Sequence, residues 1–166
     1  RLLAETDARA GARLQGNDEL ALDAAFARGI FHHQQLQIRQ ALPAWVRADT
    51  LQRMLFPMDT QRAIVIRMNL ADALSRSGEP DKAIALMRAI LADPLLDAKQ
   101  IGGNRVATVQ MNLARALRNQ GKYDEALPLA QAAAATAERI YGADNYQTLT
   151  LRSTIASIQD SAGMPV

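Results

Sequence analysis

The chain lacks cysteine, and aromatic side chains make up only 4% of its 166 residues. Without cysteine it has no disulfide, thiolate zinc site or cysteine nucleophile. A sheet protein normally draws on Tyr, Phe, Trp and Thr as well as Val and Ile, so the shortage of aromatics disfavours β structure. The apolar residues, 49% of the chain, are mostly Ala and Leu, which have high helix propensity. Composition therefore favours an all-α fold.

Long runs of one charge or of apolar residues are also missing. The chain has 19 basic and 17 acidic residues, a balance too even to suggest direct contact with nucleic acid. No run approaches the roughly 18 apolar residues of a membrane span, so we expect no membrane insertion. The chain begins at Arg1 without a signal-peptide pattern, and we interpret it as a fragment of a longer protein. A cysteine-free domain suits cytoplasm and periplasm equally, so the compartment stays open.

An internal duplication is the clearest positive signal. The segment MNLADAL, from Met68 to Leu74, recurs 43 residues later as MNLARAL, from Met111 to Leu117. The same spacing relates three further pairs, Gly78 with Gly121, Asp81 with Asp124, and Ala83 with Ala126. Chance is a poor explanation for so many matches at one spacing, and repeats of this length indicate a solenoid.

Each copy has the residues that a helical hairpin needs. Leu70, Ala71 and Leu74 fall on one helical face. Gly78 stands where that helix must end, because glycine tolerates the left-handed cap conformation. Asp81 then places a carboxylate near the free N–H groups of a second helix. Such a hairpin leaves an apolar flank exposed, so we expect neighbours to stack on it.

The pattern Leu-Ala-x-x-Leu-x-x-x-Gly-x-x-x-x-Ala resembles the tetratricopeptide repeat. The 43-residue period, with Asn69 and Asn112 before the Leu-Ala pair, resembles the kinesin-light-chain-like subclass. Residues 137–149, which contain a Gly-x-Asp followed by a Thr-Leu pair, fit that subclass, as does Pro128 near the start of its helix. The resemblance implies antiparallel hairpins stacked in a right-handed solenoid of about seven or eight helices.

This resemblance divides the chain unevenly. We assign residues 60–101 and 102–146 to full repeats, and residues 147–166 to a repeat truncated before its second helix. We expect residues 1–41 to form a divergent helical hairpin. Whether this hairpin is a true repeat stays open. Residues 42–61 depart from the pattern, and we expect an irregular insertion with one short amphipathic helix.

Candidates for chemistry are few. His32 and His33 are neighbours, so on a helix they point about 100° apart and cannot face one metal; we expect one toward the core and one toward solvent. Gly102-Gly103-Asn104 is interpreted as the turn before a helix near Arg105, with Asn104 as a cap, rather than as a phosphate loop.

Other polar residues also lack the partners that catalysis needs. A row of hydroxyl side chains lacks a histidine base within sequence reach and predicts only a polar helix face. The row consists of Ser153, Thr154, Ser157 and Ser161. We therefore expect no enzyme activity, no metal and no cofactor.

The resemblance implies a concave groove that is lined by the first helix of each hairpin and binds a protein or peptide. The candidate binding residues are Asn69, Asp72, Arg76, Asn112, Arg115, Arg118 and Asn119. The asparagines would bind a peptide backbone through their paired donor and acceptor groups, and the arginines would bind carboxylates. The alternative is that these are ordinary solvated residues on a helix.

The sequence therefore predicts a protein- or peptide-binding scaffold. By resemblance, such an array is the interaction or sensor module of a larger bacterial regulatory protein. One alternative is a small-molecule sensor with a pocket near residues 42–61, lined by Trp45 and Phe56. Another is self-association into a homo-oligomer through uncapped array ends. We expect Trp45 to be buried rather than exposed at an interface, and Tyr123, Tyr141 and Tyr146 to pack at helix junctions.

Overall fold

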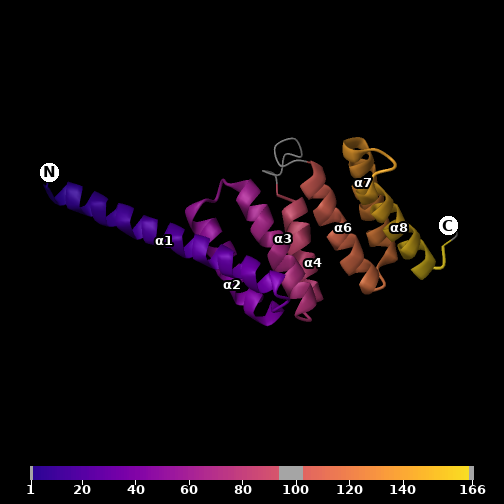
Figure 1. Cartoon of the computed structure of the whole chain (residues 1–166), viewed down its shortest axis with the longest axis horizontal. Coiled ribbons are helices and arrows are strands. Elements are labelled where there is room, and N and C mark those ends of the chain that lie inside the picture. The colour runs from indigo at the N-terminus through magenta and orange to yellow at the C-terminus, as the bar shows by residue number, and fades with distance from the viewer. Residues whose placement is uncertain (1, 94–102, 165–166) are drawn as a thin grey trace. The chain divides into compact units, whose positions relative to one another are not determined.

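The structure is a computed structural model that describes residues 2–93 and 103–164, with side chains described from Gly16 onward apart from Thr60. Within these ranges all regular structure is helical, which confirms the all-α prediction (Figure 1). The helices are α1 (Leu2–Gln34), α2 (Ile38–Leu55), α3 (Thr60–Arg76), α4 (Pro80–Leu91), α6 (Gly103–Asn119), α7 (Tyr123–Tyr141) and α8 (Tyr146–Ser161).

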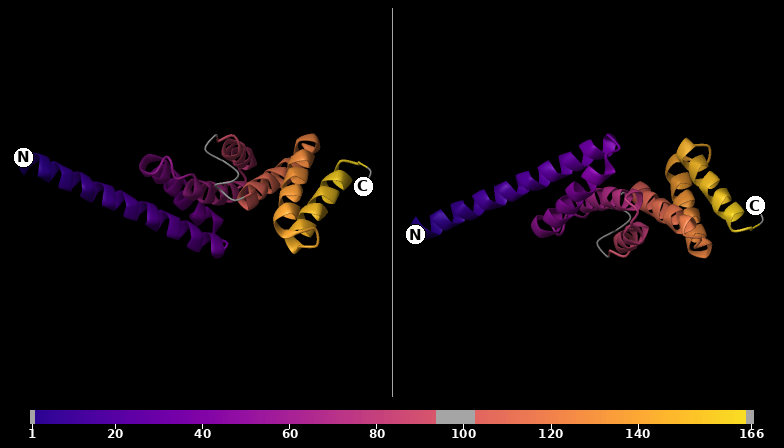
Figure 2. Two further views of the ribbon diagram at one scale, coloured as in Figure 1. Left: turned by 90° about the horizontal axis from the view of Figure 1, so that it is seen from above. Right: turned by 90° about the horizontal axis from the view of Figure 1, so that it is seen from below.

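The chain divides into two compact units, an N-terminal unit of residues 1–77 and a C-terminal unit of residues 78–166. In the N-terminal unit, α1 and α2 form an antiparallel pair, and α2 packs against α3. The N-terminal part of α1 extends past the end of α2 (Figure 2). At about 1.5 Å per residue, the 33 residues of α1 are nearly twice as long as the 18 of α2.

The α1–α2 pair is built around Trp45, whose side chain has no exposed surface. The indole lies over Gly29 of α1, so closely that a β-carbon at Gly29 would meet its ring atoms at 2.7 Å. Phe26 packs edge-on against the indole at 5.5 Å between ring centroids, and His33 does so at 6.4 Å. Trp45 is therefore a core residue, as predicted.

Two buried polar side chains join α2 to α3 and to the turn between these helices. Asp49 accepts from Arg67 Nε of α3 at 3.1 Å and from Arg53 at 2.8 Å. Gln52, fully buried, donates from Nε2 to the carbonyl oxygens of Phe56 at 3.1 Å and Asp59 at 3.3 Å. The bonds from Gln52 satisfy backbone groups in the turn.

The local structure predicted for the N-terminal third is wrong in two places. Residues 1–41 do not contain a hairpin, because α1 runs without a break from Leu2 to Gln34. Residues 42–61 are not an irregular insertion, because Ile38–Leu55 is one helix that includes Pro43. The chain turns instead at Leu36, whose φ is +58°, and Gln37 N–H donates to the His32 carbonyl across the turn.

Physical reasons account for both errors. A single glycine inside a helix costs only about 1 kcal/mol relative to alanine, so Gly16 does not interrupt α1. Proline removes one backbone hydrogen bond, and α2 tolerates this loss because Ala41, Trp45 and Ala48 bury its inner face. Pro128 likewise lies inside α7, which begins at Tyr123. The sequence resemblance had placed this proline near the start of the helix.

In the C-terminal unit, α6 packs against α4 and α7, and α7 packs against α8. The inner face of α7 is almost entirely alanine, and each of these alanines is buried: Ala126, Ala130, Ala133, Ala134 and Ala137. Against it α6 presents its own buried residues, among them Leu113 and Leu117. Small side chains on one helix and large ones on the other allow the axes to approach closely.

The ends of the repeated helices agree with the sequence prediction. Gly78 and Gly121 have φ of +86° and +74°, each just after a first helix of the duplication. Asp81 lies in the first turn of α4. At the start of α8 the Asn145 side chain accepts from Gln147 N–H at 2.9 Å, and the buried Thr148 hydroxyl donates to the Gly142 carbonyl at 2.8 Å. Among the described helices, none is long and apolar enough to cross a membrane.

The Trp45–Gly29 contact predicts opposite effects for two glycines of α1. Gly29→Ala forces a β-carbon into the indole and should destabilise the chain by about 1–3 kcal/mol. Gly16→Ala enters open space within the same helix and should stabilise it by about 0.5–1 kcal/mol. Thermal unfolding followed by circular dichroism measures both, and equal effects at the two sites would contradict this packing.

Asp49 predicts a second contrast, between a buried and an exposed ion pair. Asp49→Ala leaves Arg67 without its buried carboxylate and should cost about 3 kcal/mol. Asp23 pairs with Arg62, but its side chain is 66% exposed, so Asp23→Ala should cost less than about 1 kcal/mol. Urea denaturation of the two variants beside wild type tests this. A small loss at Asp49 would show that the α2–α3 contact does not depend on its charge.

Candidate functional site

One face of α6 collects both apolar and basic side chains in the C-terminal unit. Asn104, Thr108, Met111, Arg115 and Arg118 follow one another at three- or four-residue spacing, so they lie along one side of the helix. The N-terminal half of this stripe opens into a hollow of about 280 Å³ between α6, the end of α7 and the start of α8. We call it the tyrosine hollow.

The tyrosine hollow combines an apolar interior with an aromatic rim. Met111 of α6 and Leu151 of α8 line it, together with Ala137 of α7. Tyr141 and Tyr146 also line it, with 38% and 81% of their surface exposed. The prediction that these tyrosines are junction packing residues is therefore wrong, above all for Tyr146. Exposed tyrosines beside an apolar hollow are typical of binding surfaces.

The two arginines farther along the stripe differ in their contacts. Arg118 is half-buried and donates to Ser157 Oγ of α8 at 2.9 Å and to Asn119 Oδ1 at 3.2 Å. Arg118 thus holds α6 and α8 together. Arg115 is exposed and has no ion pair among the described residues. Asn112 is half-buried beside the stripe, and its side chain has no hydrogen-bond partner within the described part of the chain. Arg115 and Asn112 are therefore available to a ligand.

The remaining candidates lie on α3 in the N-terminal unit, where they are engaged in internal contacts. Asn69 donates from Nδ2 to the Val65 carbonyl at 2.8 Å, within its own helix. Asp72 contacts His33 Nε2 of α1 at 2.9 Å and Arg76 at 3.6 Å. Asp72 is thus part of the contact between α1 and α3. Arg76 and Asp72 are both exposed, and Asn69 is half-buried.

The histidines do not divide into one core and one solvent residue as predicted, because both are half-buried. His33 lies against Trp45 and Asp72, whereas His32 Nδ1 and Gln37 Oε1 form a hydrogen bond of 2.8 Å. In the described ranges no group of three or more potential ligand residues could hold a metal ion.

The predicted turn before α6 is only partly visible, since Gly102 lies outside the described residues. Asn104 is not a cap, because α6 already begins at Gly103 and Asn104 lies inside it. The hydroxyl row on α8 is a polar face: Thr154 and Ser161 donate to carbonyls of their own helix, and Ser157 accepts from Arg118.

Comparison with known families decides the identity of these hairpins. Residues 105–165 match the tetratricopeptide repeat family, and residues 23–101 match a second family described as tetratrico peptide repeat. The chain belongs to the tetratricopeptide-repeat proteins. The predicted family is thus confirmed, and the match from residue 23 extends across the segment predicted to be an insertion. Tetratricopeptide arrays are protein-interaction scaffolds, a fold class without catalytic function of its own.

A solved structure with the same fold is that of BtubC (BKLC) from P. vanneervenii. It is 16% identical in sequence and aligns with a TM-score of 0.57 over 91% of this chain and 68% of that one. This likeness confirms the predicted fold class of stacked helical hairpins, and BtubC is itself a kinesin-light-chain-like tetratricopeptide protein. No curated protein matches the chain.

Proposed function

We propose that this tetratricopeptide domain is a non-enzymatic scaffold that binds a peptide segment on α6 and α8. The tyrosine hollow would take one large apolar side chain, and Arg115 would bind a neighbouring carboxylate. The observation that carries this proposal is the position of Met111 and Arg115 on one stripe of α6, with Arg115 free of ion pairs among the described residues.

The spacing of these two features suits an extended peptide. Met111 and Arg115 are four residues apart on α6, which is about 6 Å along the helix. In an extended chain, side chains two positions apart lie on the same side and are separated by about 7 Å. We therefore expect an apolar residue and an Asp or Glu two positions away from it in the bound segment.

The other predicted residues would take different parts in binding. Asn112 keeps both its donor and its acceptor for the backbone of a peptide. Asn69 uses one of its two N–H donors within α3, so its second N–H and its oxygen are left for a ligand. Arg118 donates to Ser157 of α8 and to Asn119 beside it, so these two residues would act in binding only after leaving that contact. Asp72 and Arg76 form a polar patch on α3 that remains a candidate contact.

A peptide suits these features better than a small molecule. The tyrosine hollow, at about 280 Å³, is smaller than most sites for drug-sized ligands but sufficient for one large side chain. Trp45 does not line a pocket as the small-molecule alternative expects, because the indole is fully buried and lies directly on Gly29. A hollow does lie beside Pro43, Ala44 and Arg47, but Trp45 and Phe56 are not part of its lining. We propose, by resemblance alone, that the parent protein is a bacterial regulator.

A selection from a random peptide library tests the proposed site. Peptides selected on the wild-type chain should contain a large apolar residue with Asp or Glu two positions away. Their affinity, measured by fluorescence anisotropy, should fall at least about tenfold in Leu151→Lys, which fills the hollow, and in Arg115→Glu, which repels the carboxylate. Lys122→Gln, a change of an exposed cation in the α6–α7 turn, should bind like wild type.

Circular dichroism and thermal unfolding must show that the variants stay folded. Selected peptides that bind both Leu151→Lys and Arg115→Glu as tightly as wild type would refute this site on α6 and α8.

A further inference from the structure

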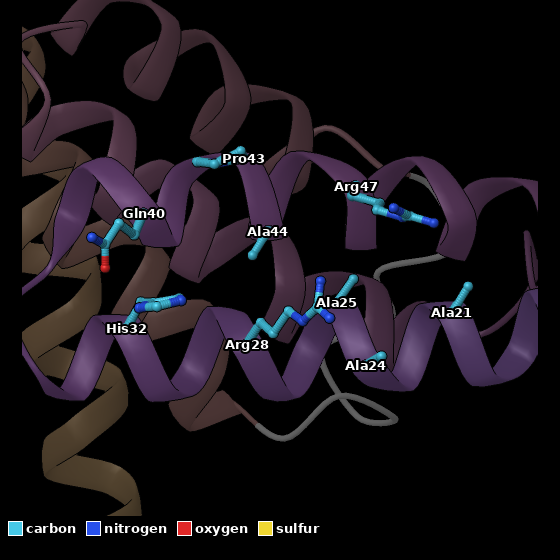
Figure 3. Close-up of a pocket in the computed structure, with 9 residues that line it drawn as sticks. All are labelled: Ala21, Ala24, Ala25, Arg28, His32, Gln40, Pro43, Ala44 and Arg47. Carbon is cyan, nitrogen blue, oxygen red and sulfur yellow. The ribbon is translucent and has the colours of Figure 1, made fainter.

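A second hollow lies between α1 and α2 in the N-terminal unit, with a volume of about 490 Å³ (Figure 3). We call it the α1–α2 hollow. Its floor is made of small side chains, among them Ala21, Ala24 and Ala44. Arg28 and His32 of α1 and Arg47 of α2 stand around this floor, and Gln40 lies opposite His32. The floor is therefore apolar and shallow, and basic side chains surround it.

The charge of the α1–α2 hollow is uncompensated. None of its lining residues is acidic. Arg53, Arg62, Arg67 and Arg76 of the same unit each contact a carboxylate. By contrast, neither Arg28 nor Arg47 has an ion pair among the described residues. The unit thus pairs four of its arginines internally, while Arg28 and Arg47 at this hollow, like the exposed Arg39 outside it, have no ion pair among the described residues.

The α1–α2 hollow lies on a side of α1 that α3 does not cover. Asp23 and His33 of α1 contact Arg62 and Asp72 of α3. Arg28 is five residues from each of them, which places it about 140° away around the helix axis. In repeat proteins the free face of a hairpin is where another element stacks. An apolar element packed here would bury two unpaired arginines, which is strongly unfavourable.

We propose that the α1–α2 hollow is a second docking site, which binds an acidic peptide segment of a partner protein. One carboxylate lies between Arg28 and Arg47, and small side chains of the segment rest on the alanine floor. Guanidinium groups bind carboxylates through paired hydrogen bonds, and two of them from facing helices fix the position of one acid. This site belongs to the other unit and does not depend on the proposed peptide site of α6 and α8.

Synthetic peptides of defined charge test this site. A short fluorescein-labelled peptide of glutamate and alanine should bind the full chain, whereas the same peptide with glutamine for every glutamate should not. The double variant Arg28→Gln, Arg47→Gln should bind the acidic peptide at least about tenfold more weakly. Arg39→Gln, an exposed arginine of α2 outside the hollow, is the matched control and should bind like wild type.

Two further variants separate the hollow from general charge. Ala24→Trp fills the floor but keeps both arginines, and it should also abolish binding of the acidic peptide. Lys122→Gln should bind this peptide normally, because it removes an exposed cation of the other unit that lines neither hollow. All changed residues in the α1–α2 hollow are exposed, so thermal unfolding should be close to that of wild type.

Several results would overturn the proposal. Absent binding of the acidic peptide to wild type, or undiminished binding by the double variant, would refute it. Equal binding of the glutamine peptide would show that the hollow does not distinguish a charged peptide from a neutral one. A single-stranded oligonucleotide that binds more tightly than the acidic peptide, and loses affinity in the double variant, would make the hollow a polyanion site instead.

Discussion

Close approach of helices through small side chains is the constraint on which the rest of this structure depends. In the N-terminal unit it is most severe at Gly29, where the indole of Trp45 occupies the place of a side chain. The Trp45 N–H is buried and has no hydrogen-bond partner among the described residues, so packing alone fixes the ring. Leaving a buried donor unpaired costs about 1–3 kcal/mol, and burial of a large aromatic ring offsets it. In the C-terminal unit the alanines of α7 have the same role against α6.

The same constraint explains where the two hollows form. Small side chains allow two helices to approach closely. Where a row of small side chains continues beyond the buried contact, the surface there is hollowed, because no large side chain fills the space. In the α1–α2 hollow, Ala25 is buried in the helix contact while Ala24 beside it is exposed at the floor. In the tyrosine hollow, Ala107 and Ala137 are buried at its base. Packing and concave surface therefore arise from one feature of the composition, its richness in alanine.

The sequence was informative where the backbone needs a particular residue and uninformative where it does not. Gly78, Gly121 and Asp81 mark helix ends because glycine suits the left-handed conformation and a carboxylate suits a helix N-terminus, so these helix ends of the duplication were predicted correctly. The turn at Leu36 uses a left-handed residue that is not glycine, and Pro43 lies within a helix, so neither gave a usable signal. The hollows require knowledge of which helices meet. Periodicity placed Arg115 on a helix face but could not show that Tyr141 and Tyr146 lie beside the same face.

The contacts of the arginines distinguish structural charge from charge that is free for a partner. A partly buried arginine with a fixed partner, such as Arg67 with Asp49 or Arg118 with Ser157, contributes to the helix contacts, and its loss would loosen the fold. Exposed pairs such as Arg88 with Glu125 and Arg152 with Glu138 contribute little, because water screens them. An arginine beside a hollow and without an internal partner stabilises neither the core nor a surface pair. Arg28, Arg47 and Arg115 share this property, although they belong to different units and different surfaces. Under the two proposals, these three arginines contribute to the binding of an acidic partner and not to the stability of the fold.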